Sequence, residues 1–272
     1  MNEWHVAEAP AKLNLTLLVG PVRPDGKHEV VTILERLSLS DTVAVRRAEQ
    51  TRVEGFPQDT LVRAALEALA GASGEGSCFE ARIEKRIPVA AGLGGGSSDA
   101  AAALRLANAL LDAPLVPEQL HRLAAGLGAD VPFFLRDRPQ LASGDGTELE
   151  PIELPRDYVV LLALPNGATK TSTAAVYSAF DRRGGERSFD ERRRMLLAEI
   201  DDLRTPRDLA MLPGNDLGGS PLAGELRRTG SFRADVTGAG PVVYALFDDE
   251  DIARQAGAEI AGSATTWLVA PT

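Results

Sequence analysis

The chain has 272 residues, of which 44% are hydrophobic and 25% charged, enough to bury one large core or two moderate ones. Its formal net charge of −10 argues against a nucleic-acid-binding surface, because proteins that bind phosphate backbones carry a basic face. No apolar run reaches the length of a membrane span and the amino terminus lacks the features of a signal peptide, so we expect a cytoplasmic protein with neither membrane nor nucleic acid as a partner.

The first predicted element is a strand at residues 12–17, where polar and apolar side chains alternate. Lys12, Asn14 and Thr16 share one face, and leucines occupy the other. A strand whose polar face meets solvent explains this pattern. A pocket wall that presents an ammonium beside an amide explains it equally well, and both interpretations stay open at this point.

A turn, two further strands and a helix follow. The turn at residues 24–28 carries His28, which is either solvated or brought into a pocket by the neighbouring polar strand. The patterns predict strands at residues 30–39 and 42–45 and a helix at residues 60–70.

The most informative segment is PVAAGLGGGSS at residues 88–98, between a predicted strand at 79–87 and an alanine-rich helix at 100–111. Its glycines allow positive φ and let backbone N–H groups converge on a phosphate, and the helix, which we expect to open near Ser97 and Ser98, adds unpaired N–H groups. The segment lacks the lysine of a Walker motif and the last glycine of a dinucleotide motif. A flexible linker is the alternative, but linkers do not lie within a strand–loop–helix unit. The sequence therefore predicts a nucleotide phosphate site formed by Pro88, Val89, Ala90, Ala91, Gly92, Leu93, Gly94, Gly95, Gly96, Ser97 and Ser98.

A second amphipathic helix is predicted at residues 117–127, and it releases the chain into the segment GADVPFFL. Asp130 is the one charged residue of that segment, and its apolar neighbours shield it partly from water. Such a carboxylate needs a cationic or hydrogen-bonding partner. Helix capping by Asp130 is the alternative interpretation.

The pattern restarts at about residue 150, which indicates a second, small α+β domain. Its predicted elements are a strand at 158–164, helices at 173–180, 189–200 and 217–228, a strand at 242–247, a helix at 251–260 and a strand at 265–269.

Three motifs in chain order carry a resemblance to a known superfamily: PAKLNL at 10–15, the glycine segment at 88–98, and TGAG at 237–240. Together they resemble the GHMP kinases, which include galactokinase, homoserine kinase, mevalonate kinase and phosphomevalonate kinase. The PAKLNL and GADVPFF segments are most similar to the branch that phosphorylates a cytidyl diphosphate alcohol of isoprenoid synthesis. The resemblance implies an α+β fold of two domains, a mixed α/β amino-terminal domain at residues 1–150 and a ferredoxin-like carboxyl-terminal domain at residues 151–272.

The resemblance also implies a chemistry, phosphoryl transfer from ATP with Mg²⁺ as counter-charge. Asp130 would accept the proton of the substrate hydroxyl, and Lys12 would stabilise the alkoxide and the γ-phosphoryl charge. The glycine segment would hold the ATP phosphates. Ser98 is a candidate Mg²⁺ contact, and the sequence identifies no carboxylate ligand for the metal.

On the substrate side, the resemblance implies that Asn14, His28, Thr171 and Tyr177 bind the small-molecule cytidyl diphosphate substrate, with Tyr177 stacked on the base. The family usually has an aromatic residue just before this histidine, where this chain has Lys27. One stacking face on a base contributes about 1–3 kcal/mol. A cation–π contact from Lys27 is the expected partial substitute.

Two other functions stay open on the sequence. One is another superfamily kinase that acts on homoserine, mevalonate or a sugar, and the other is a nucleotide-binding protein without catalytic activity. A monomer or a weak homodimer is expected.

Overall fold

The structure, a computed structural model, describes residues 3–56, 60–168 and 172–272, and its contacts divide the chain into two compact units. The first unit contains Met1–Ala11, Leu39–Val89 and Gly94–Asp137, and the second contains Lys12–Ser38, Ala90–Leu93 and Arg138–Thr272. Strands β1 (His5–Val22) and β2 (His28–Ala48) each pass from one unit into the other along the chain. The domain boundary expected at residue 150 refers to the two domains of the family and not to these contact-based units, so it stays a prediction.

The sheet of the first unit is built around β4 (Cys78–Glu84), which alternates as its sequence predicts. Phe79, Ala81 and Ile83 are buried on one face of this strand. Its neighbours are β3 (Arg52–Glu54), which is parallel to it, and the carboxyl-terminal part of β2, which is antiparallel to it.

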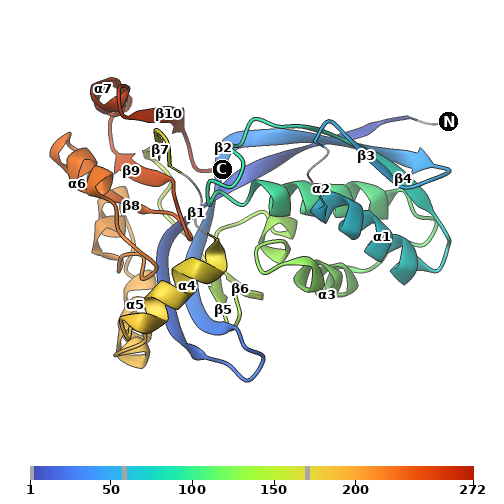
Figure 1. The fold of residues 1–272 in the computed structure, drawn as a ribbon, viewed down its shortest axis with the longest axis horizontal. Coiled ribbons are helices and arrows are strands. Elements are labelled where there is room, and N and C mark those ends of the chain that lie inside the picture. The colour runs from blue at the N-terminus through green and yellow to red at the C-terminus, as the bar shows by residue number, and fades with distance from the viewer. Residues whose placement is uncertain (1–2, 57–59, 169–171) are drawn as a thin grey trace. The chain divides into compact units, whose positions relative to one another are not determined.

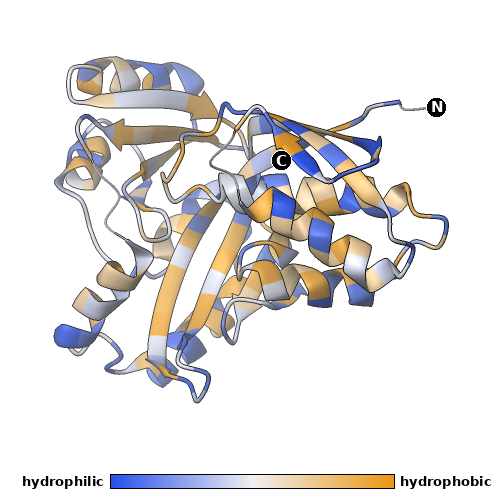
Figure 2. Cartoon of the chain, turned by 45° about the vertical axis from the view of Figure 1, so that its right-hand side comes forward, coloured by the Kyte–Doolittle hydropathy of each residue, from blue (hydrophilic) through white to orange (hydrophobic). Residues whose placement is uncertain are grey.

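Helices cover this sheet and supply the rest of the first unit's core (Figure 1). Helices α1 (Leu61–Ser73) and α2 (Gly95–Ala109) pack on the sheet, and α3 (Pro117–Leu127) and the short 3₁₀ helix η1 (Pro132–Leu135) pack on those helices. Apolar and polar residues lie side by side along these helices in Figure 2, as expected for helices with one buried face. The alanine-rich run of α2 lets it pack closely against α1, because small side chains permit a short distance between helix axes.

The second unit contains an antiparallel sheet in the order β10-β7-β9-β8. Its members are β7 (Val159–Pro165), β8 (Arg233–Val236), β9 (Val243–Phe247) and β10 (Ala264–Val269). Helices α6 (Pro221–Arg228) and α7 (Glu250–Ile260) pack on this sheet (Figure 1). The succession β7-α6-β8-β9-α7-β10 with this strand order is the ferredoxin-like arrangement, which confirms the predicted fold of the carboxyl-terminal half.

The remaining elements of the second unit extend β2 and add helices. They are β5 (Gln140–Ser143), β6 (Glu148–Pro151), α4 (Thr173–Arg182), α5 (Phe189–Ile200) and the 3₁₀ helix η2 (Pro206–Met211). Phe180 of α4 packs into an apolar cluster with Leu17, Val19, Val30 and Leu217. This cluster fixes α4 beside the first two strands of the unit.

Several elements differ from the sequence prediction: β3, β5 and β6 were not predicted, and the helix predicted at 217–228 begins only at Pro221. The two strands predicted at 30–39 and 42–45 are one strand, β2, because each unit supplies partners for its own part: Ser38 N donates to Ala270 O at 2.9 Å, and Thr42 is opposite Glu84. Helix α2 begins at Gly95, two residues before its predicted opening near Ser97, so that Gly95 and Gly96 lie in its first turn. Within the described residues, no helix combines the length and the apolar character needed to cross a membrane.

Candidate functional site

The polar face of β1 is buried in the second unit. Lys12 is 4% exposed, Asn14 5% and Thr16 1%, while Leu13 and Leu15 on the opposite face are fully buried. The interpretation of a solvated strand face is therefore wrong. A strand that buries an ammonium and an amide together is a feature of binding sites, because burying a charge is costly unless a polar arrangement compensates it.

A chain of hydrogen bonds runs across this buried face. Lys12 Nζ donates to Asn14 Oδ1, and Asn14 Nδ2 donates to Thr32 Oγ1 at 2.8 Å. Thr32 Oγ1 in turn donates to Thr16 O at 2.6 Å. Each donor in this chain has a defined acceptor, so the ammonium of Lys12 and the amide of Asn14 are held in one orientation.

Two glycine segments approach these side chains within the second unit. A methyl group at Gly92 would lie 2.8 Å from Thr237 O and 2.9 Å from Gly240 O, so the two segments touch through their backbones. A methyl group at Gly238 would lie 3.3 Å from Lys12 Nζ and also 3.3 Å from Asn14 Oδ1. Both glycines have positive φ, which glycine adopts without strain. The first strand and the two glycine motifs that the sequence singled out therefore meet around the Lys12 ammonium.

Further hydrogen bonds hold this junction together. Asn14 N donates to Thr237 Oγ1 at 3.0 Å, and Lys12 N donates to Leu93 O at 2.9 Å. Asn215 Nδ2 donates to Val236 O and Gly238 O at 2.9 and 2.7 Å. The sequence did not identify Thr32, Thr237 or Asn215 as site residues, because each acts through a partner far away along the chain.

In the first unit, the glycine segment leads into α2 with backbone conformations that suit anion binding. Gly94 is the N-cap residue with φ of 71°, and no side chain caps the helix. The first N–H groups of a helix have no partner within the helix, and the helix dipole makes this end positive. A side chain at Gly96 would meet no atom within 4 Å. These features agree with the predicted phosphate site at residues 88–98.

One buried atom bears on the expected metal ion. Ser98 Oγ is buried and has no hydrogen-bond partner in the described part of the chain. In that same part, no group of three His, Cys, Asp or Glu side chains could hold a metal ion. The hydroxyl of Ser98 thus fits a Mg²⁺ ion that takes its other ligands from phosphate oxygens and water, as Mg²⁺ commonly does.

Asp130 lies in the first unit, half-buried in the turn between α3 and η1. Phe133 and Phe134 of η1 are buried and contact each other edge to face with centroids 5.0 Å apart, which anchors this turn. Val131, not Asp130, is the N-cap residue of η1. Asp130 is therefore not the N-cap of η1, and its role as a partly shielded carboxylate stays a prediction.

His28 and Tyr177, two of the predicted substrate residues, lie together in the second unit. Their ring centroids are 5.1 Å apart, and Phe180 contacts His28 edge to face at 5.8 Å. His28 Nδ1 lies 2.8 Å from Gly20 O, and its Nε2 lies 3.2 Å from Asp181 Oδ1. Asp181 was missed by the sequence analysis, although its position four residues after Tyr177 places both on one helix face. Thr171, the fourth predicted substrate residue, lies outside the described residues.

Lys27 differs from its expected role. Its ammonium pairs with Asp145 Oδ2 at 2.5 Å on the surface of the second unit, and its expected cation–π contact with the substrate base stays a prediction. Burial raises the pKa of the Asp145 carboxyl, but hydrogen bonds from Lys27 and Thr147 outweigh burial and leave this pKa below its ordinary value. The two aromatic rings that contact His28, those of Tyr177 and Phe180, both come from α4.

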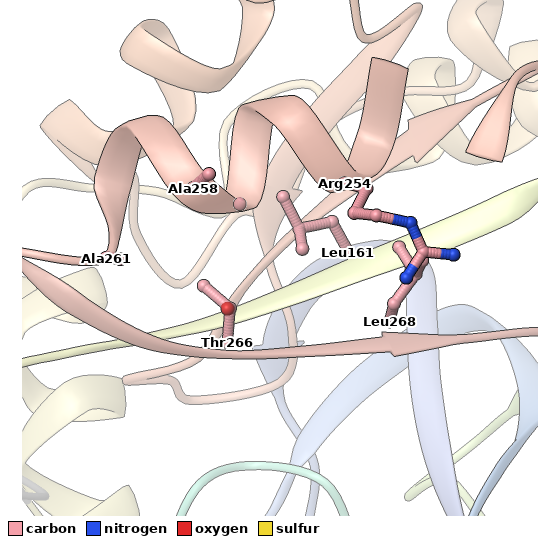
Figure 3. A pocket seen from close by; sticks show the side chains of 7 residues that line it. Leu161, Arg254, Ala258, Ala261, Thr266 and Leu268 are labelled. Atoms are coloured by element: carbon pink, nitrogen blue, oxygen red, sulfur yellow. The ribbon is translucent and has the colours of Figure 1, made fainter. Parts of the chain in front are cut away.

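A hollow also lies between α7 and the sheet of the second unit (Figure 3). Figure 3 shows Leu161 and Leu268 beneath the helix, with the guanidinium of Arg254 at one end. Its other lining residues are Gly257, Ala258, Ala261 and Thr266. None of the predicted site residues lines this hollow, and its mainly aliphatic lining offers little chemistry for phosphoryl transfer.

The fold and the two glycine motifs are those of a GHMP kinase. The family description "GHMP kinases N terminal domain" matches residues 60–138. The crystal structure of the Methanococcus jannaschii mevalonate kinase has a TM-score of 0.72 at 13% identity and covers 99% of each chain, which shows that the fold is shared.

Closer relatives narrow this class. A 4-diphosphocytidyl-2-C-methyl-D-erythritol kinase from Rhodococcus jostii (strain RHA1) is 38% identical over 280 residues, which cover 95% of this chain and 88% of that protein. A crystal structure titled 4-(cytidine 5'-diphospho)-2C-methyl-D-erythritol kinase is 30% identical, covers 98% of this chain and 99% of that one, and has a TM-score of 0.78. The chain belongs to the family of 4-diphosphocytidyl-2-C-methyl-D-erythritol kinases.

Proposed function

We propose that this protein transfers the γ-phosphoryl group of ATP to the 2-hydroxyl of 4-diphosphocytidyl-2-C-methyl-D-erythritol, a step of isoprenoid precursor synthesis in the cytoplasm. The products are ADP and the 2-phosphate, and the proton of the hydroxyl passes to a protein base. The observation that carries the choice of substrate is the 38% identity, over 95% of the chain, to a relative of that name.

The glycine segment is proposed to bind the triphosphate. Phosphoryl transfer needs little covalent chemistry from the protein, so catalysis consists mainly of positioning and charge stabilisation. Backbone N–H groups at the start of α2 suit this task because they are fixed before the substrate arrives. Support comes from Ala90, whose φ of 60° is strained for a residue with a side chain and of the kind that functional loops retain.

Lys12 and Asp130 are proposed to act on the acceptor. Asp130 takes the hydroxyl proton as general base, and Lys12 stabilises the negative charge that develops on the acceptor oxygen and the γ-phosphoryl group. The burial of Lys12 supports its role, because charge interactions are stronger where water is excluded. Mg²⁺, when bound with ATP, supplies counter-charge to the β- and γ-oxygens, and Ser98 is its proposed protein ligand.

His28 and Tyr177 are proposed to bind the cytosine base. Their rings lie 5.1 Å apart, and the partly exposed Tyr177 offers a surface on which a base can stack. Asn14 and Thr171 complete the proposed substrate contacts.

The substitution Asp130→Asn tests the mechanism. It keeps the shape of the side chain but removes the base, so we expect kcat to fall about 10²- to 10⁴-fold while ATP still binds. Coupled ADP-release kinetics measure turnover, and calorimetry with a non-hydrolysable ATP analogue measures binding. Asp137→Asn, which alters a carboxylate 83% exposed in the same unit, is the matched control and should behave like the wild type.

Assays with different acceptors test the substrate. The wild-type protein should release ADP with the cytidyl alcohol and not with homoserine or mevalonate, and ³¹P NMR should show the new monophosphate ester. Turnover of homoserine without turnover of the cytidyl alcohol contradicts the proposal. Wild-type turnover by the Asp130→Asn variant contradicts the assignment of the base.

A further inference from the structure

A buried cluster of three charged side chains lies in the first unit, outside the residues assigned above. Lys85 Nζ is 2.5 Å from Asp41 Oδ2 and 2.6 Å from Asp99 Oδ2. Both carboxylates are completely buried, and the Lys85 side chain is 16% exposed. Two carboxylates and one ammonium give this cluster a net negative charge.

The backbone places the three residues together. Asp41 precedes Thr42 on β2, Lys85 follows Glu84 of β4, and Thr42 and Glu84 are directly opposite in the antiparallel pair. Asp99 lies in α2, just after its first turn. The cluster therefore joins the end of the strand pair to the beginning of the helix.

Asp41 also holds the chain that enters the glycine segment. Its Oδ1 accepts hydrogen bonds from Arg86 N at 2.6 Å and Ile87 N at 2.8 Å. These two residues immediately precede Pro88, the first residue of the segment. One carboxylate thus fixes Lys85 through one oxygen and the backbone of the segment's entry through the other.

The entry and the exit of the segment also touch each other. A methyl group at Gly95, the first residue of α2, would lie 3.1 Å from Ile87 Cγ2 and 3.2 Å from Lys85 Nζ. The ammonium of Lys85 consequently lies against the backbone of the helix start while it is held by both carboxylates.

The charge state of Lys85 follows from its partners. Burial lowers the pKa of the Lys85 ammonium, but the hydrogen bonds and charges of Asp41 and Asp99 outweigh burial and raise this pKa above its ordinary value. The ammonium is held by both carboxylates and is therefore not available as a mobile phosphate ligand like the lysine of a Walker loop.

We infer that Lys85, Asp41 and Asp99 are positioning residues for ATP: they fix residues 86–87 and the start of α2 relative to each other, so that the N–H groups between them are preorganised for the phosphates. This inference rests on the proposed function insofar as it takes ATP to be the ligand of the glycine segment. None of the three side chains needs to touch ATP.

Substitutions that keep size but break the cluster test this inference. Asp41→Asn turns an N–H donor toward the Lys85 ammonium or loses the bonds to Arg86 N and Ile87 N, so we expect the KM and the Kd for ATP to rise at least about tenfold. Lys85→Met leaves two buried carboxylates facing each other and should act similarly. Asp99→Asn retains one acceptor oxygen and should raise both constants less. In all three variants, we expect kcat and the KM for the acceptor to change less than about threefold.

The matched control is Glu80→Gln, which breaks the partly buried ion pair of Glu80 with Arg46 on the same two strands, β4 and β2. If the cluster were merely structural, the three cluster variants and Glu80→Gln would all have lower melting temperatures. At temperatures well below melting, their affinity for ATP would then equal that of the wild type. Asp99→Asn is the mildest change, so ATP binding can still be measured in this variant if Asp41→Asn or Lys85→Met fails to fold.

The outcomes separate this inference from the proposed function, since ATP binding is measured by calorimetry without an acceptor. Weaker ATP binding in the cluster variants but not in Glu80→Gln supports the inference. Unchanged ATP binding in folded cluster variants overturns the inference, because the cluster then does not position the segment. Tighter ATP binding overturns it as well, because the cluster then acts through its net negative charge. A wild-type protein that binds ATP but does not phosphorylate the cytidyl alcohol overturns the proposed function alone, and one that does not bind ATP overturns both.

Discussion

At the scale of single residues, Asn14 shows how one amide can orient a charged neighbour. Its backbone N–H donates to Thr237 Oγ1, its Oδ1 accepts from Lys12 Nζ, and its Nδ2 donates to Thr32 Oγ1. The hydroxyl of Thr32 donates its one hydrogen bond to Thr16 O, so it can only accept a hydrogen bond from Asn14. Thr32 thus selects the amide orientation in which oxygen, not nitrogen, faces the Lys12 ammonium.

The substitution Thr32→Val tests this selection. Valine has nearly the same shape but no oxygen, so Asn14 Nδ2 and Thr16 O lose a partner in a buried site, at a cost of about 1–3 kcal/mol. Asn14 can then turn its amide and present N–H groups to Lys12. We expect kcat in the ADP-release assay to fall about 10- to 100-fold, with little change in the KM for ATP.

Thr32→Ser is the control for this prediction, because it keeps the hydroxyl and removes a methyl group. It should retain most of the wild-type kcat. Equal losses in the valine and serine variants would mean that packing at Thr32, and not its hydrogen bonds, matters for turnover.

At the scale of elements, the glycine segment contains glycines with different physical tasks. Gly92 has φ of 87°, and a methyl group there would press on two carbonyl oxygens of the other glycine motif. Gly96 lies in the first turn of α2, with no positive φ and nothing within 4 Å of an added methyl group. Glycine is therefore required by the fold at the first position and not at the second.

The pair Gly92→Ala and Gly96→Ala tests this distinction by thermal and urea unfolding. Gly92→Ala should lower the free energy of unfolding by about 1–3 kcal/mol, because it combines strain at positive φ with backbone overlap. Gly96→Ala should be neutral or should stabilise the protein by up to about 1 kcal/mol, because alanine favours helix. The opposite order of stabilities contradicts the assignment. If Gly96→Ala weakens ATP binding without loss of stability, a phosphate approaches the backbone at that residue.

The elements also show what the sequence could and could not predict. The alternation in β4, the apolar face of α3 and the bounds of α5 depend on near neighbours in the chain, and they were predicted well. The predicted break in β2 falls at Ser40 and Asp41, where the backbone N–H partners of the Asp41 side chain, Arg86 and Ile87, are far away along the chain. The same reason hid the partner of His28, since Asp181 lies on another element. Motifs pointed to the candidate reactive residues, whereas the side chains hydrogen-bonded to them, such as Thr32, were found only in the structure.

At the scale of the whole molecule, stability depends on buried groups that have no part in the proposed reaction. Glu35 of β2 is completely buried in the second unit, with Arg156 Nη2 3.7 Å from its Oε1. Burial raises the pKa of the Glu35 carboxyl to about 7, although Arg156 and the N–H of Arg36 oppose this rise. The hydroxyl of Tyr158 is buried near this carboxyl, and burial and the charge of Glu35 raise its pKa well above the ordinary value. A carboxyl that is neutral when folded and ionised when unfolded makes stability depend on pH.

The sign of this dependence follows from proton binding. Between the ordinary pKa of a glutamate and about 7, the folded protein holds the Glu35 proton and the unfolded chain does not, so the contribution of Glu35 is present at low pH and is lost as pH rises through the folded pKa. Urea unfolding at pH 5 and pH 8 measures it, as the difference in unfolding free energy between the wild type and Glu35→Gln. From pH 5 to pH 8, we expect the wild type to lose about 2–3 kcal/mol of unfolding free energy relative to Glu35→Gln. Glu153→Gln, at a site 86% exposed in the same unit, is the control, and its unfolding free energy relative to the wild type should change by less than about 0.5 kcal/mol over the same pH range. An equally small change for Glu35→Gln would mean that the buried carboxyl of Glu35 is already ionised at pH 5.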